Sequence, residues 1–157
     1  MKFSKRLDFC MKTTIFALFL IIGAILSSPD TKAQSENAIL GVWFNTEKTA
    51  QVEIFKRGAT FFGKIVWLKD PNPGGKPAVD KVNSDLKLKT RPLMGLNLLE
   101  GLRFDDGIWD GGTIYDPKSG KTYSCQISLK SAEVLEVKGY IGFSLIGRTV
   151  EWTKAKK

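Results

Sequence analysis

Acidic side chains next to predicted turns are the residues of this sequence best suited to chemistry. Carboxylates can act as general acids or bases, or as calcium ligands; the aspartates concerned are Asp70, Asp80, Asp85, Asp105, Asp106, Asp110 and Asp116. None has the spacing of a calcium-binding loop. The chain holds no histidine, which removes Ser-His-Asp and Cys-His nucleophiles, imidazole bases and His-ligated zinc. We therefore expect no metal and no cofactor, and an enzyme only if two carboxylates converge in one cleft.

The first 33 residues have the pattern of a cleaved export signal. Four basic residues within residues 2–12 precede an uncharged, mostly apolar run over residues 13–26. This run is shorter than the roughly 20 residues that span a bilayer. Small residues at Thr31 and Ala33 predict cleavage after Ala33, which leaves residues 34–157 as a single domain, periplasmic or secreted. An uncleaved membrane anchor is the alternative; otherwise the chain meets a membrane only through its signal peptide.

Charge and cysteine content narrow the partners of the mature domain. The whole chain carries a net charge of +8, which falls to +5 without residues 1–33 and to +2 without the terminal Lys154, Lys156 and Lys157. So small a charge argues against a groove that tracks phosphates, and we expect no nucleic acid. Cys10 precedes the predicted cut, so Cys125 is the single thiol left. Its strand-like surroundings predict a buried small hydrophobe, with an intermolecular disulfide as the alternative.

Hydrophobic residues after Ile39 alternate with a period of two, which is typical of half-buried strands. Turn residues separate most of the strands: KRG at 56–58, DDG at 105–107 and DPKSG at 116–120. A long connection rich in proline and glycine covers Lys69 to Arg91. The eight predicted strands are Leu40–Asn45, Ala50–Lys56, Thr60–Leu68, Leu93–Leu99, Ile108–Tyr115, Thr122–Lys130, Val134–Tyr140 and Arg148–Thr153.

Eight short strands can form a sandwich or close into a barrel, and one pair of residues favours the barrel. Trp43 belongs to a Gly-x-Trp triplet in the first strand, and Arg148 shares the parity of the apolar Val150 and Trp152 in the last. An inward guanidinium can stack on an indole. This combination resembles the lipocalin pattern, which implies an all-β, eight-stranded antiparallel up-and-down barrel closed at one end by Trp43 and Arg148. The alternative leaves Arg148 in water at the entrance of its strand.

A second resemblance covers Ile39 to Thr153. Seven strings stand in the order and spacing seen in bacterial domain of unknown function 2147: GVW at 41–43, GKIVWL at 63–68, RPLMGL at 91–96, WDGGTIYDP at 109–117, GKTY at 120–123, LEVKGYIG at 135–142 and GR at 147–148. The resemblance implies an exported protein with a lipocalin-like barrel, and no particular reaction. Cysteines that family members often carry near the positions of Phe62 and Met94 are absent from this chain.

Candidate binding residues follow from the barrel. Aromatic and polar side chains offer a pocket lining, which we expect from Lys64, Trp67, Asn97, Trp109, Tyr115 and Tyr123. A rim is expected from Asp70, Asp80, Asp85 and Arg91. Two alternatives stay open. Lys64 faces inward only if Phe62 and Val66 do, and outward if Phe61, Ile65 and Trp67 form the core; the aromatics could also simply fill the barrel.

Three functions are compatible with these residues. The first is an exported module that binds a small, mostly apolar ligand, with the long connection as a rim or lid. The second is a non-enzymatic interaction or structural protein of the cell envelope, whose loops carry the contacts. The third is a hydrolase or isomerase that depends on two carboxylates.

Overall fold

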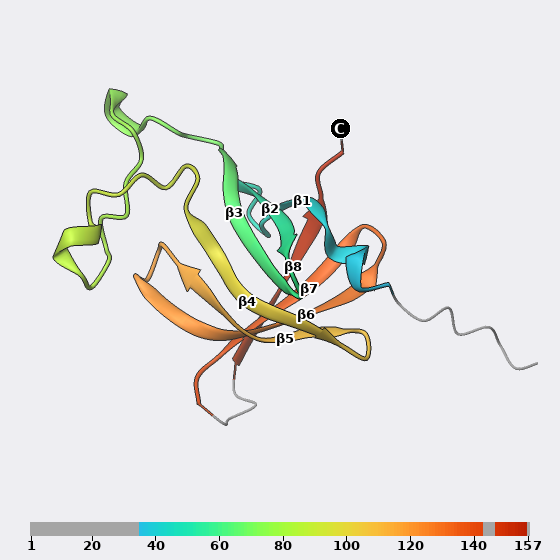
Figure 1. The fold of residues 1–157 in the computed structure, drawn as a ribbon. Helices are drawn as coiled ribbons and strands as arrows, with labels where there is room; N and C mark the ends of the chain where they lie inside the picture. The colour runs from blue at the N-terminus through green and yellow to red at the C-terminus, as the bar shows by residue number, and fades with distance from the viewer. Residues whose placement is uncertain (1–34, 143–146, 157) are drawn as a thin grey trace, which may run out of the picture. The chain divides into compact units, whose positions relative to one another are not determined.

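The strands wrap into a closed barrel. The computed structural model describes residues 35–142 and 147–156, and within them eight antiparallel strands follow one another around the barrel in sequence order (Figure 1). The strands are β1 Gly41–Phe44, β2 Ala50–Arg57, β3 Thr60–Leu68, β4 Asn97–Asp105, β5 Ile108–Asp116, β6 Lys121–Ser131, β7 Val134–Tyr140 and β8 Gly147–Lys154. The last strand closes the barrel by pairing with β1, Trp43 opposite Lys154 and Phe44 opposite Thr153. The predicted eight-stranded antiparallel barrel is confirmed.

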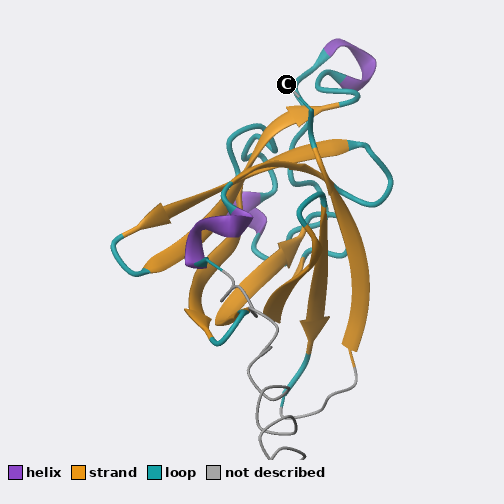
Figure 2. Cartoon of the chain, turned by 90° about the vertical axis from the view of Figure 1, so that its right-hand side faces the viewer, coloured by secondary structure: helices purple, strands orange, loops and turns teal. Residues whose placement is uncertain are grey.

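Three short 3₁₀ helices complete the described part of the chain. Helix η2 (Glu36–Ile39) precedes β1 and lies across one end of the barrel, the end that Figure 2 looks onto. Helices η3 (Pro73–Gly75) and η4 (Leu86–Leu88) belong to the long connection between β3 and β4. Among residues 35–142 and 147–156, no helix is long and apolar enough to cross a bilayer. The predicted signal peptide and its cleavage position lie outside the described residues.

Alternation along the strands places the core. On β2, Val52 and Ile54 are buried while Glu53 between them is only half-buried, as expected for a strand with one face toward the interior. The tight turn between β4 and β5 follows the sequence just as directly. Asp106 and Gly107 both adopt positive φ, 41° and 84°, which is the backbone of a two-residue hairpin turn that favours Asp-Gly.

The fourth strand differs from the prediction. It spans Asn97–Asp105 instead of Leu93–Leu99, because Leu93 and Leu96 form a turn in which the Leu96 N–H donates to the Leu93 carbonyl. Further along, Gly101 has a φ of 76° and interrupts the alternation, so that both Leu99 and Leu102 are buried. A bulge of this kind inserts one residue and breaks the period of two, which is why the sequence pattern ended too early.

Candidate functional site

A cavity occupies the half of the barrel away from η2. Its volume is about 1060 Å³, slightly above the roughly 300–1,000 Å³ typical of small-molecule pockets. In the deeper part of the cavity the wall is apolar. Every strand except β1 and β6 contributes to it, through Ala50, Val52, Ile65, Leu68, Leu98, Ile114, Val137, Val150 and Trp152. The barrel is therefore hollow along part of its length.

The other half of the barrel is packed solid. Trp43, Phe61 and Trp109 are fully buried there, and the ring of Phe61 meets that of Trp109 edge-on at 6.3 Å between centroids. Two indole N–H groups hold η2 across this end: Trp43 donates to the Ile39 carbonyl at 2.8 Å and Trp109 to the Glu36 carbonyl at 3.0 Å. These bonds satisfy two buried donors and hold η2 as a cap over this end of the barrel. Aromatic residues thus fill this half of the barrel, while Trp152 lines the cavity in the other half.

The expected pair of Trp43 and Arg148 does not form. Lys154 takes the place of the arginine: its Nζ lies 4.6 Å from the centre of the Trp43 ring and donates to the Leu40 carbonyl at 3.4 Å. Strand β8 runs from the open end of the barrel to the closed end, so Arg148 lies six residues, or roughly 20 Å, from Lys154. The prediction had the right face of β8 for Arg148 and the wrong end.

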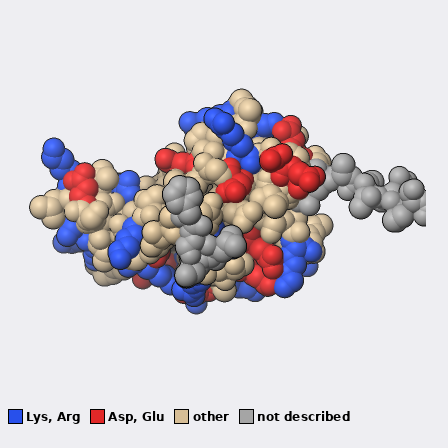
Figure 3. Space-filling model, turned by 90° about the horizontal axis from the view of Figure 1, so that it is seen from below, with Lys and Arg blue, Asp and Glu red and all other residues tan. Residues whose placement is uncertain are grey.

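Polar side chains surround the open end of the cavity. They come from the β1–β2, β3–β4 and β5–β6 connections and include Glu47, Lys69, Asp70 and Lys118. Lys118 forms an ion pair with Glu47, and its N–H donates to the Asp116 carboxylate at 3.0 Å. Both signs of charge are also mixed on the face of the molecule seen in Figure 3. The mouth is thus polar, and its described charges of opposite sign partly compensate one another.

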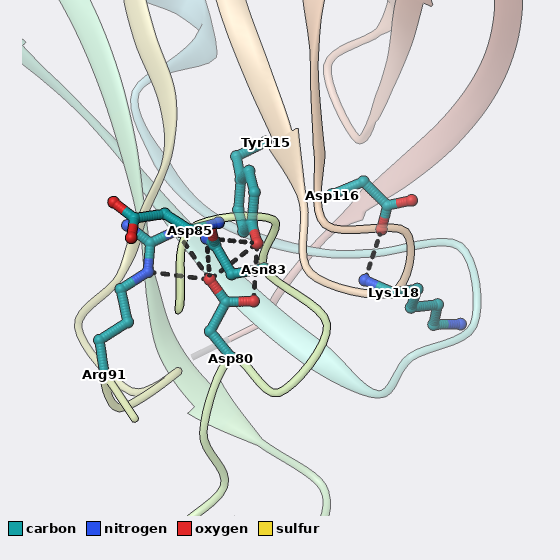
Figure 4. A network of polar contacts seen from close by, with 7 residues as sticks. All are labelled: Asp80, Asn83, Asp85, Arg91, Tyr115, Asp116 and Lys118. Atoms are coloured by element: carbon teal, nitrogen blue, oxygen red, sulfur yellow. Dashed lines mark hydrogen bonds and ion pairs between the residues drawn. The ribbon is translucent and has the colours of Figure 1, made fainter. Parts of the chain in front are cut away.

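The long connection between β3 and β4 is fastened to the barrel by one buried carboxylate (Figure 4). Asp80 is 1% exposed and accepts hydrogen bonds from the Tyr115 hydroxyl at 2.7 Å, the Asn83 amide at 2.7 Å and Nε of Arg91 at 2.9 Å. Arg91 adds an ion pair through Nη2 at 2.8 Å, and its guanidinium lies 4.9 Å from the centre of the Tyr115 ring. A buried charge needs such a full set of partners.

The pKa values of this group follow from its surroundings. Burial works to raise the pKa of the Asp80 carboxyl, but the hydrogen bonds from Tyr115, Asn83 and Arg91 and the positive charge of Arg91 outweigh it, so the pKa is lowered. Burial raises the pKa of the Tyr115 phenol, and the hydrogen bond to Asp80 and its negative charge raise it further. At neutral pH the network consists of a carboxylate, a guanidinium and a neutral phenol. We name these four residues, Asp80, Asn83, Arg91 and Tyr115, the loop latch.

Backbone contacts bring the connection close to the barrel. Gly120 adopts a φ of 69°, and a Cβ on it would lie 2.1 Å from the Val82 carbonyl oxygen, so only glycine allows this approach. A second, more polar cavity of about 650 Å³ lies beside the contact, with Asp85, Arg91, Asn97, Glu100 and Lys121 in its lining. Leu98, Tyr115, Tyr123 and Ile141 border both cavities. The two cavities therefore adjoin one another at the mouth.

The structure separates the predicted pocket residues into three groups. Tyr115 and Tyr123 border the large cavity, and Asn97 borders the polar one. Trp109 is buried in the packed half. Lys64 and Trp67 lie outside the barrel: Lys64 pairs with Glu53 at 3.0 Å, and Trp67 is 38% exposed and packs edge-on against Phe44. The predictions of Lys64, Trp67 and Trp109 as cavity-lining residues were wrong.

A bulge explains why Trp67 points outward. Gln51 pairs with Trp67 and Val52 with Ile65, so the residue between, Val66, has no partner on β2 and the parity of β3 changes there. Phe61 and Ile65 form part of the core as one alternative proposed. Beyond the bulge, Leu68 lines the cavity in place of Trp67.

The predicted rim residues also separate. Asp70 borders the mouth of the large cavity, and Asp85 and Arg91 border the polar one. Asp85 also caps η4 by accepting the Lys87 N–H at 2.9 Å. Asp80 lies in the loop latch and is not available to a ligand. Sequence reasoning missed Asn83, Lys118 and Lys154. It placed Val150 and Trp152 on the inward face of β8, where both line the cavity.

Acid–base or metal chemistry finds little support in this arrangement. Asp80 is the one buried carboxylate among residues 35–142 and 147–156, and its lowered pKa is the reverse of what a general acid near neutral pH requires. Within the same described residues, no three acidic or cysteine side chains are grouped closely enough to hold a metal ion. Among the described residues, the large cavity is therefore taken as the candidate site.

Comparisons with known proteins agree with this fold. Residues 41–154 match the family model described as an uncharacterised protein conserved in bacteria, DUF2147. Among solved structures, protein HP1028 from Helicobacter pylori, described as belonging to the lipocalin family, is similar with a TM-score of 0.65 and 26% identity over 75% of this chain and 83% of that one. A search of the curated proteins gave no match.

Proposed function

We propose from the cavity itself that this chain, which belongs to the DUF2147 family of bacterial proteins, binds a small, mostly apolar ligand. The carrying observation is the space of about 1060 Å³ that leads from a polar mouth into the barrel and is lined in its deeper part by aliphatic side chains and Trp152. Burial of an apolar ligand against such a wall contributes about 25 cal/mol per Å² of apolar surface. The similarity to a lipocalin of known structure supports the same function.

Filling the cavity tests this proposal. We expect Val150→Trp, whose indole projects into the cavity, to abolish binding of the neutral fluorophore N-phenylnaphthylamine and retention of any co-purified molecule in native mass spectrometry. Thr149→Trp is the matched control, since Thr149 is exposed on the same strand and does not line the cavity. Both variants must keep the melting temperature of the wild type within a few degrees.

The outcome can contradict the proposal in two ways. Equal binding by Val150→Trp and wild type would show that the fluorophore sits elsewhere. Failure of the wild type to bind the fluorophore, together with a solid barrel interior by xenon or nitroxide relaxation, would remove the function altogether. Trp152 is the tryptophan of the cavity wall, so a change in tryptophan fluorescence on ligand addition that is lost in Trp152→Phe gives an independent readout of occupancy.

We also propose that the domain works outside the cytoplasm. The proposal is supported by the basic residues within residues 2–12 and the apolar run that follows. Expression of the full chain with a carboxyl-terminal tag, followed by cell fractionation and sequencing of the amino terminus, tests it. We expect a mature protein that begins at Gln34 in the periplasm or medium; a full-length protein in the cytoplasm would contradict export.

A further inference from the structure

We propose that the ligand is an anionic amphiphile whose carboxylate or phosphate head is held by Arg148 at the mouth while its apolar tail fills the barrel. This inference rests on the proposed binding function. Its starting point is a cation directly above the apolar wall: Arg148 lines the large cavity on the same face of β8 as Val150 and Trp152, which follow it toward the closed end.

The register places Arg148 where its side chain has room. Arg148 pairs with Gly139 on β7, and glycine contributes no side chain on that face. The atoms nearest to a Cβ at Gly139 belong to Ile114 and Tyr123, both at 3.6 Å. The stretch of β7 that pairs with Arg148 therefore faces an aliphatic side chain and a tyrosine, so that an anion held by Arg148 would meet apolar surface on its inner side.

The other described charges leave Arg148 available. Five ion pairs are present among residues 35–142 and 147–156, and Arg148 takes part in none of them. Lys69 and Lys118 also border the mouth. Lys118 is paired with Glu47, and Lys69 belongs to the β3–β4 connection and not to the inward face of a strand. Arg91 is held by Asp80. Arg148 is exposed in the present structure, so a ligand head can reach it before the tail covers it.

The chemistry of the guanidinium selects the head group. A planar fork of N–H donors matches the oxygen pair of a carboxylate or a phosphate, and bonds between charged partners are roughly twice as strong as neutral ones. Below Arg148 the wall is aliphatic down to Trp152, which suits a hydrocarbon tail. A cation at the entrance and an apolar lining beneath it form one site with two chemically distinct parts.

A matched series of probes tests the inference on the full chain after removal of its export signal in the cell. Dodecanoate, dodecyl phosphate and dodecanol share one tail, while acetate and inorganic phosphate carry the head alone. We expect isothermal titration to give affinities at least about tenfold higher for the two anionic amphiphiles than for dodecanol, with the preference falling as salt is added. The head groups alone should bind far more weakly than either amphiphile.

Two variants separate Arg148 from general charge. Arg148→Met should bind all three amphiphiles with the affinity that the wild type shows for dodecanol. Lys138→Met removes the same charge from β7 at a position paired with Thr149 and absent from the cavity lining, and it should keep the wild-type preference. A circular-dichroism melting curve checks that both variants fold.

The remaining outcomes distinguish this inference from the binding function beneath it. Equal affinity of the wild type for dodecanoate, dodecyl phosphate and dodecanol overturns the anionic head and leaves the apolar site intact. A preference that persists in Arg148→Met overturns the assignment to this residue. Acetate or phosphate binding as tightly as the amphiphiles overturns the combined site. If no amphiphile binds at all, the proposed function itself fails.

Discussion

At the scale of single residues, the two cations of β8, Arg148 and Lys154, lie at opposite ends of the barrel and have different surroundings. Lys154 lies over the Trp43 ring in the packed half of the barrel, and Arg148 stands at the open mouth of the cavity. Both point inward, since they share the parity of Val150 and Trp152. Position along the strand, and not direction of the side chain, thus decides that one cation packs on an indole and the other lies at the mouth of the cavity.

This difference predicts unequal effects on stability. We expect Lys154→Met to lower the free energy of unfolding by about 1 kcal/mol, because a partly desolvated cation over an indole contributes between about 0.5 and 2 kcal/mol. Arg148→Met is the matched control and should leave stability unchanged, since it has no ring or carboxylate partner among the described residues. Urea unfolding followed by tryptophan fluorescence measures both. Equal loss in the two variants would contradict the separation of roles.

The sequence predicts which side chains of β8 point into the barrel, but not which end of β8 lies at the open end of the barrel. Parity alone places Arg148 inside; which end it occupies depends on the direction of the strand and on η2, which the period of two does not reveal. Trp67 fails for another reason, since the bulge between Ile65 and Trp67 depends on the pairing partner Gln51. A bulge reverses parity without a clear signal in the strand that carries it.

At the scale of elements, the long connection is an ordered piece of structure. Its two arms pair with one another, since the Asp80 N–H donates to the Arg91 carbonyl at 3.1 Å and the Leu93 N–H to the Ala78 carbonyl at 2.9 Å. The loop latch then binds the paired arms to β5 through Tyr115. Prolines and glycines mark residues 71–75 as irregular, but the partner that orders the connection lies 35 residues away from Asp80, beyond the reach of local pattern.

The loop latch predicts a pH-dependent docking of this connection. The folded-state pKa of Asp80 is lowered from its ordinary 3.8, so the docked form binds fewer protons and docking weakens as the pH falls below that value. The pKa of Tyr115 is raised from 10.0, so the contribution of its neutral phenol to docking is lost only as the pH rises above 10.0. NMR relaxation of backbone amides in residues 76–96 should therefore report rigid arms near neutral pH and mobile arms in acid.

A substitution gives the same prediction at fixed pH. Asp80→Asn should weaken docking by about 2 kcal/mol at pH 7, because Arg91 and Tyr115 lose their charged acceptor, while the barrel strands keep their amide protection. Asp70→Asn on the same connection is the control, as Asp70 is exposed and outside the latch. Arms that stay rigid in Asp80→Asn, or that loosen equally in Asp70→Asn, would show that another contact holds the connection.

Most strands followed from alternation and turn residues, and the exception is instructive. The hydrophobic residues at Leu93–Leu99 predict a strand there. The observed β4 continues to Asp105, and the bulge at Gly101 interrupts the alternation that would have indicated this. Local pattern thus locates a strand wherever pairing is regular. Local pattern fails at a bulge, where two residues of one strand lie opposite a single residue of the neighbouring strand.

At the scale of the whole molecule, the barrel combines a packed half with a hollow half. The closed end contains the largest buried side chains and is capped by η2 through two indole N–H groups. The hollow half gives up dispersion contacts that a filled core would have. A closed sheet tolerates this loss because its backbone hydrogen bonds run around the entire circumference and leave few open edges.

The reactivity of the Cys125 thiol measures how often the closed barrel opens. The thiol is fully buried in β6, and burial, with the negative charge of Asp110 as a smaller cause, raises its pKa to about 12. We therefore expect iodoacetamide at pH 8 to modify Cys125 only when the barrel opens, in a chain that carries Cys10→Ser so that one thiol is followed. The free energy of opening from the labelling rate should equal that from urea unfolding.

The same measurement connects stability to binding. A ligand that occupies the cavity binds the folded barrel and not the unfolded chain, so dodecanoate at a hundred times its Kd should slow labelling about a hundredfold. The denatured protein in urea, in which Cys125 reacts freely, is the control for reagent activity. Labelling at the rate of an exposed thiol in the absence of denaturant would mean that β6 opens locally, and the barrel would then not behave as one cooperative unit.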